Sequence, residues 1–269
     1  MKRDWLACAF FLTCVSSLWG SPTVEEIVRR SVQNTNVDWA AAPQYSFTER
    51  DIVTKHGKRS MKTYRVVMID GSPYNQLIAA DGRQLSPQQA KNEERKLKRE
   101  IQHRHHQTTG ERQRRIAAYQ RERRQDHALM SEMVKAFDFT LRGEEAVAGH
   151  RCFVLSATPK PRYQPISRDT KVLKGMRGEM WIDAEQYQWM KVRAEVFRPV
   201  AFGLFIADVQ PGTEFTLEQK PVENNIWLPS HFSTQIKATV LFFSNRSTDD
   251  ETYFGYQHVA NVERAGGIN

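Results

Sequence analysis

The stretch GEMWIDAEQYQWMKVRAEVF, Gly178–Phe197, decides the fold. It begins with the short apolar run Met180–Ile182, and Asp183 then opens a polar turn. Beyond the turn, apolar and charged residues alternate as far as Val196. A period of two is typical of a strand with one buried face and one face in water. The stretch therefore predicts two antiparallel strands around a tight turn, and it carries no catalytic group.

The same alternation recurs on both sides of this hairpin, with turn residues such as His56-Gly57 and Asp70-Gly71 between the segments. One helix precedes the strands: Pro22–Asn36 has a capping Ser or Thr, two acidic residues in its first turn and an apolar face. The sequence thus predicts an α+β fold with one N-terminal helix and a long antiparallel meander. Its further strands are expected at 44–54, 62–69, 74–80, 137–141, 151–157, 214–221, 227–243 and 251–262.

A charged segment, residues 84–136, interrupts the meander. Its part from 84 to 127 holds twelve Lys and Arg but six Asp and Glu, and so accounts for most of the net charge of +8. Ser86-Pro87 starts a first helix, and a second helix is expected over 111–136. Only the end of the second helix has an apolar stripe, Leu129 to Phe137. We therefore predict an inserted helical hairpin that docks by this end and projects elsewhere.

The N-terminus resembles an export signal. Lys2 and Arg3 precede the apolar run Leu6–Trp19, and Gly20 lies at a suitable cleavage point. Lipidation at Cys14 and an uncleaved anchor are alternatives. The predicted organisation is a signal peptide over 1–20 and one domain over 21–269 that includes the insertion 84–136. The protein is expected to be exported, and to be periplasmic or associated with the outer membrane.

Catalytic and metal-binding patterns are weak. Cys152 lies in an apolar strand, which favours an inert buried thiol over a nucleophile. No G-x-S-x-G motif or glycine-rich phosphate loop is present. Histidines cluster in the charged segment without a metalloprotease motif, which favours solvated side chains over a zinc site; they are His103, His105, His106 and His127. We predict a protein that is not an enzyme and that needs no cofactor or metal.

Two motifs resemble the outer-membrane lipoprotein-sorting (LolA-like) superfamily. They are the G-E-M-W-I-D turn at 178–183, followed by the basic strand that begins at Gln188-Trp189, and the strand Phe47–Arg50 after the first helix. The resemblance covers about 23–81 and 137–262, and the charged insertion departs from the family pattern. It implies a half-barrel, an incomplete antiparallel β-barrel wrapped around the N-terminal helix. It also implies an apolar cavity that takes lipid acyl chains.

Apolar residues on the strands could line such a cavity or fill an ordinary core, and the sequence leaves both readings open. The cavity candidates are Phe47, Val66, Met68, Met190, Val192, Phe215, Leu217, Phe232, Ile236 and Val240. The expected ligand is a lipid, an acyl chain or another apolar molecule.

The alternative function is that of a scaffold or sensor whose charged hairpin binds an envelope protein or an anionic membrane surface. Its candidates are Arg95, Lys98, Arg112, Arg115, Arg121 and Arg124. Nucleic acid is not an expected partner, because the basic run has one aromatic residue for stacking, Tyr119, and the protein is expected to be exported.

Overall fold

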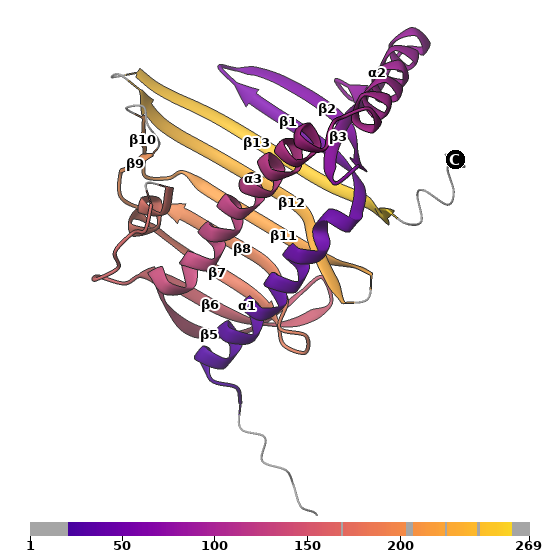
Figure 1. Ribbon diagram of the computed structural model, residues 1–269. Coiled ribbons are helices and arrows are strands. Elements are labelled where there is room, and N and C mark those ends of the chain that lie inside the picture. The colour runs from indigo at the N-terminus through magenta and orange to yellow at the C-terminus, as the bar shows by residue number, and fades with distance from the viewer. Residues whose placement is uncertain (1–20, 168, 203–206, 224, 241–242, 260–269) are drawn as a thin grey trace, which may run out of the picture.

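The computed structural model describes residues 21–167, 169–202, 207–223, 225–240 and 243–259. The proposed export signal lies outside these residues. Within them, thirteen strands form one antiparallel sheet, in which eleven strands follow the order β4-β3-β2-β1-β13-β12-β11-β8-β7-β6-β5. The ends of this path do not join, so the sheet is open (Figure 1). The predicted fold class is confirmed: the chain is α+β, and its open sheet with an N-terminal helix is consistent with a half-barrel.

The strands of this sheet differ in burial: the three between 150 and 196 hold many of the buried residues, whereas the edge strand 137–147 is mostly exposed. Their bounds are β1 Tyr45–Lys55, β2 Lys58–Ile69, β3 Ser72–Ala80, β4 Arg83–Gln84, β5 Phe137–Val147, β6 His150–Pro159, β7 Met176–Asp183, β8 Trp189–Val196, β9 Val200–Phe202, β10 Ala207–Val209, β11 Glu214–Glu223, β12 Ile226–Val240 and β13 Phe243–His258. The short strands β9 and β10 pair with each other, and β10 also pairs with β12.

The stretch Gly178–Phe197 forms most of β7, a turn and β8. Met180 pairs with Val192 in register, and the turn is held by the side chain of Asp183. Its Oδ1 accepts hydrogen bonds from the backbone N–H groups of Glu185, at 3.0 Å, and Gln186, at 2.6 Å. The aspartate thus supplies the acceptors that a tight turn needs, which is why the W-I-D sequence ends the strand.

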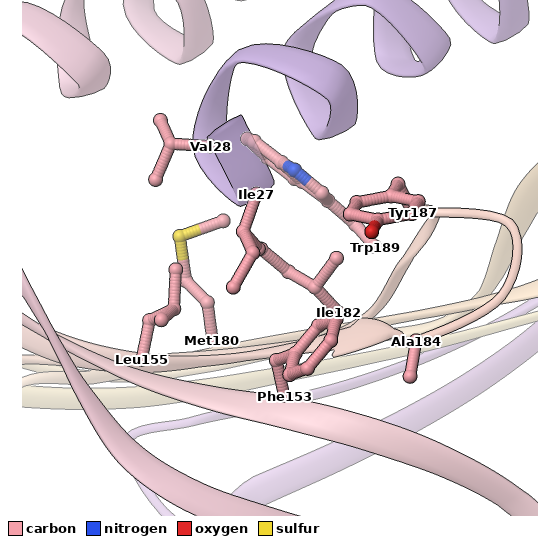
Figure 2. Close-up of a cluster of buried hydrophobic side chains, with 9 residues drawn as sticks. All are labelled: Ile27, Val28, Phe153, Leu155, Met180, Ile182, Ala184, Tyr187 and Trp189. Atoms are coloured by element: carbon pink, nitrogen blue, oxygen red, sulfur yellow. The ribbon is translucent and has the colours of Figure 1, made fainter. Parts of the chain in front are cut away.

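Helix α1, Val24–Ala41, packs across one face of the sheet (Figure 1). Figure 2 shows Ile27 and Val28 within the largest core cluster, with Ile27 directed toward Met180 and Ile182. At the far end of the helix, Asp38 accepts a hydrogen bond from the backbone N–H of Trp227 at 2.9 Å. Both ends of α1 are therefore attached to the sheet.

Two further helices occupy the charged segment: α2, Pro87–His105, and α3, Thr109–Ala136. Each begins with a capping box, formed by Ser86 with Gln89 and by Thr108 with Glu111. A capping box satisfies backbone N–H groups that would otherwise lack partners, and it thereby fixes where each helix begins. Among the described helices, none combines the length and the apolar character that crossing a membrane requires.

Helix α3 lies across the same face of the sheet as α1 (Figure 1). Near its start, Arg115 donates a 2.6 Å hydrogen bond to Ser72 Oγ beside the β2–β3 turn. In its middle, Arg123 donates to the backbone oxygen of Trp39 in α1, and the His127 ring lies 4.4 Å from the Trp39 ring. The prediction that α3 docks only by its apolar end is therefore wrong. Its outer part is held by polar and aromatic contacts, which hydrophobic periodicity does not detect.

Helix α2 is attached to β3 through one buried side chain, Arg104, which is 6% exposed. Its guanidinium donates to the backbone oxygens of Ile69, Ser72 and Pro73 at 2.9, 2.8 and 3.1 Å. It also pairs with Glu100 one turn earlier, at 2.6 Å. The guanidinium has the planar, multiple-donor shape needed to bind several carbonyls at once.

Candidate functional site

An apolar cavity of about 380 Å³ lies between α3 and the sheet. Its roof is formed by Met130 and Met133 of α3 and by Val172 and Leu173 of the 3-10 helix η2, Asp169–Gly175. Its floor is the helix-bearing face of β6, β7, β8, β11 and β12. A cavity of this size and character is the usual form of a site for a small apolar ligand.

The floor is hollow because it combines large side chains with very small ones. Ala157, Gly178 and Ala194 lie side by side on β6, β7 and β8, where Ala157 pairs with Gly178 and Gly178 with Ala194. On the neighbouring strand β11, the large side chain of Phe215 lies directly beside Ala194 on the same face of the sheet. At this one row, three consecutive strands thus contribute little side-chain volume, which leaves room for the cavity.

One polar group in the cavity wall has no partner. Trp189 lines the cavity and is 3% exposed, and its indole N–H makes no hydrogen bond within the described residues. A buried indole N–H usually finds an acceptor, because leaving it unpaired costs free energy. Trp189 thus contributes ring surface to the wall, while its N–H is closed off without a partner among the described residues.

Half of the cavity candidates from the sequence line this space. They are Val192, Phe215, Leu217, Phe232 and Ile236, which come from β8, β11 and β12.

The other candidates lie elsewhere. Phe47, Val66 and Met68 belong to β1 and β2, on the far side of β13, and the Phe47 ring lies 5.2 Å from the Tyr256 ring. Met190 packs in a separate cluster with Cys152 and Trp227. It is displaced because the register shifts between Trp181 and Ile182, so that Trp189 instead takes the inner position. The side chain of Val240 lies outside the described part of the structure.

Sequence reasoning assigned Met130 and Met133 to plain docking and did not include η2 in the site. Three prolines between 159 and 170 are typical of a loop, and η2 begins at the end of that segment. The apolar pair Val172-Leu173 was the available signal, because two adjacent buried residues in a loop need an apolar surface to cover.

The basic candidates divide into two groups. Arg115 is bound to Ser72 and to the backbone oxygen of Asp70, and Arg112 lies 3.5 Å from the Asp70 carboxylate. These two residues help to attach α3 to the sheet. Arg95, Lys98, Arg121 and Arg124 are exposed.

The thiol of Cys152 is completely buried, and burial raises its pKa to about 11. Its sulfur lies 3.3 Å from the sulfur of Met190. The thiolate that nucleophilic catalysis needs is therefore disfavoured. Among the described residues, no group of three or more His, Cys, Asp and Glu side chains is arranged to hold a metal ion. His127, for example, bonds to Asn36 at 2.7 Å.

No protein-family model matches the chain, and no curated protein matches it in sequence. Solved structures match at the level of the fold. A DUF1329 family protein from Desulfovibrio piger is 13% identical over 87% of this chain and 92% of its own, with a TM-score of 0.36. A LolA superfamily protein from Nitrosomonas europaea is 11% identical over 88% and 93%, with a TM-score of 0.31. The MucA/MucB complex of Pseudomonas aeruginosa matches with 11% identity over 87% and 96%, and a TM-score of 0.22.

A LolA-like fold, which the sequence resemblance predicted, is thus among the matches. Because all of these TM-scores are below 0.5 and the identities are low, the likeness concerns the fold. Function has to be argued from the residues of this chain.

Proposed function

We propose that this protein is an exported protein of the bacterial envelope that holds a lipid, an acyl chain or another apolar ligand between α3 and the sheet, without catalysing a reaction. The observation that carries the proposal is the cavity of about 380 Å³, whose exposed surface is almost entirely apolar. Atoms around an empty apolar space lack dispersion partners on one side, whereas each methylene that enters contributes about 0.8 kcal/mol.

The direct test is to extract the purified protein with organic solvent and to analyse the extract by mass spectrometry. A lipid or acyl compound in stoichiometric amount is the expected result. If nothing is extracted and the emptied protein binds no added alkyl compound in calorimetry, the proposal is wrong.

A cavity-filling variant makes this test specific to the site. Leu217→Trp places a large side chain in the cavity and is expected to abolish ligand recovery while the protein remains folded. The control is Glu218→Trp, which adds a tryptophan to the opposite face of the same strand and should leave ligand recovery unchanged. Equal recovery from both variants would place the ligand elsewhere.

A second candidate function is attachment to an anionic surface through α2 and α3. The observation that favours it is the exposure of their basic side chains, with Lys98 69% exposed. The test uses vesicles of phosphatidylglycerol with phosphatidylcholine vesicles as the control. If this function holds, the protein sediments with the anionic vesicles, and the double substitution Arg95→Glu with Lys98→Glu abolishes the sedimentation. Unchanged sedimentation of the double variant would count against it.

A further inference from the structure

The sheet face that carries the cavity changes character at β13. Phe232, in the cavity wall on β12, lies directly opposite Glu251 on β13, and Thr234 lies opposite Asp249. Directly opposite residues of an antiparallel pair point to the same face, with Cβ atoms about 5 Å apart. The apolar wall is therefore followed, one strand further along the same face, by carboxylates.

The next strand extends this acidic area. Asp51 on β1 lies opposite Glu251, and Glu49 lies opposite Tyr253. Four carboxylates, which we call the carboxylate row, thus share one face of two neighbouring strands; they are Glu49, Asp51, Asp249 and Glu251. Like charges directly across a strand pair destabilise a sheet, so this arrangement has a cost in the protein alone.

No cation offsets this charge within the described residues. None of the four carboxylates forms an ion pair there. Lys62 on β2 lies opposite Asp51, but its side chain is exposed and makes no such pair. Lys55 on β1 lies on the same face as Asp51, and it too is exposed and makes no ion pair among the described residues. Tyr64, Tyr253 and Tyr256 also lie on this face, and Tyr253 donates a hydrogen bond to Glu251.

Oδ1 of Asp51 and Oδ1 of Asp249 are closed off from solvent, and the two carboxyl side chains are hydrogen-bonded to each other. Burial, reinforced by the neighbouring carboxylates, raises the pKa of Glu49 to about 7. Burial and a hydrogen bond with Asp51 raise the pKa of Asp249 to about 6. The ionised forms of Glu49 and Asp249 are therefore poorly solvated, and a nearby cation would favour their ionisation.

We propose that the occupant of the cavity is a cationic amphiphile, whose apolar chain lies between α3 and the sheet and whose positive group lies against the carboxylate row. This inference rests on the proposed apolar-ligand function and names the ligand class. A cation at the row would offset the repulsion between the ionised carboxylates, which lie side by side on the two strands. An anionic amphiphile of the same length, such as a fatty acid, would be repelled by the same four groups.

Three alkyl compounds that share one chain and differ in charge test the proposal. Decyltrimethylammonium, decanol and decanoate are titrated into the delipidated protein by calorimetry at pH 7.5, below their micelle-forming concentrations. We expect the Kd of the ammonium compound to be at least tenfold lower than that of decanol, and decanoate to bind more weakly than decanol.

Variants separate the row from general charge effects. Asp51→Asn with Asp249→Asn is expected to abolish the preference for the cation and leave decanol binding unchanged. The control, Asp250→Asn, removes a carboxylate from the opposite face of β13, where Asp250 bonds to His231 at 2.9 Å. It should retain the full preference. Thermal unfolding shows that each variant is folded before it is titrated.

The outcomes distinguish this inference from the proposed function. If decanol binds and the ammonium compound binds no tighter, the cationic class is wrong and the apolar-ligand function stands. If the preference survives in the double variant, the carboxylate row is not its origin, and the inference is overturned. If none of the three compounds binds, both the proposed function and the inference fail.

Discussion

At the scale of single residues, Arg104 is expected to contribute strongly to stability. Arg104→Ala would leave the backbone oxygens of Ile69, Ser72 and Pro73 without the donor they share. Because each buried unpaired group costs about 1–3 kcal/mol, we expect the free energy of unfolding to fall by at least about 2 kcal/mol. Chemical denaturation followed by circular dichroism measures this loss.

The matched control is Arg99→Ala, between one and two turns earlier on α2, where the side chain is exposed. An exposed substitution of this kind should change the stability by no more than about 0.5 kcal/mol. Arg104→Lys should recover part of the loss, since an ammonium group cannot reach all three carbonyls. Equal stability of the Arg99→Ala and Arg104→Ala variants would show that the guanidinium does not anchor α2.

Glu49 is expected to make stability depend on pH. Its pKa is raised from 4.5 to about 7 in the folded protein, chiefly by burial and then by the Glu251, Asp51 and Asp249 carboxylates. The folded state therefore holds this proton more tightly than the unfolded state. The resulting stabilisation is fully present below pH 4.5 and is lost as the pH rises through 7.

Unfolding curves at pH 5, 6, 7 and 8 test this linkage. The unfolding free energy of the wild-type protein should decline over this range, and Glu49→Gln should make the decline shallower and raise the stability at pH 8. The control Glu185→Gln changes an exposed carboxylate and should leave the slope unaltered. An identical slope in wild type and Glu49→Gln would refute the raised pKa.

At the scale of elements, the β7–β8 pair depends on Gly178. A Cβ at this position would lie 2.4 Å from the backbone oxygen of Arg193, so that the strands would have to separate. We expect Gly178→Ala to lower the unfolding free energy by about 1–3 kcal/mol, the usual cost of forcing extra volume into a packed site. Gly110→Ala is the control, because a Cβ there would meet an Arg114 side-chain nitrogen at 3.8 Å, an ordinary contact. Similar denaturation midpoints for the two variants would contradict this account.

The sheet and α1 could be predicted from the sequence because their signals are local. Alternating side chains identify strands, and the G-E-M-W-I-D stretch contains both its strand and the aspartate that closes its turn. The position of α3 could not be predicted, because its outer part is held by Arg115 and Arg123, which bond to backbone oxygens far away in the chain. Such arginines are indistinguishable in sequence from solvated ones such as Arg121.

Half of the cavity candidates from the sequence line the cavity, because local alternation identifies the face of a strand but not its neighbours in space. Alternation shows which residues share a face of one strand, and this was enough for Phe215, Leu217, Phe232 and Ile236. It does not show which strands lie beneath α3, so Phe47 and Val66 could not be separated from them. It also fails at a bulge, where a one-residue shift exchanged the faces of Trp189 and Met190.

At the scale of the whole molecule, α3 connects parts that lie far apart in the sequence. It contacts the β2–β3 turn through Arg115, α1 through Arg123 and His127, and the cavity through Met130 and Met133. A segment that lies across the sheet and completes its apolar covering cannot be an independent insertion. We therefore expect α3 and the sheet to unfold together.

Deletion of residues 87–136, with a flexible linker in their place, tests this expectation. Met130 and Val134 pack against the core cluster of Ile27 and Leu155, and Ala136 is itself buried, so the deletion exposes apolar surface on the sheet. We expect the truncated protein to lose its cooperative thermal transition and to bind a dye specific for exposed apolar surface. The comparison is the full-length protein with Arg121→Ala and Arg124→Ala, in which α3 remains and two exposed charges are removed. That variant should unfold as the wild type does. If the deleted protein instead melted cooperatively at the wild-type temperature, α3 would be a dispensable insertion, and a cavity roofed by its methionines could not be the functional site.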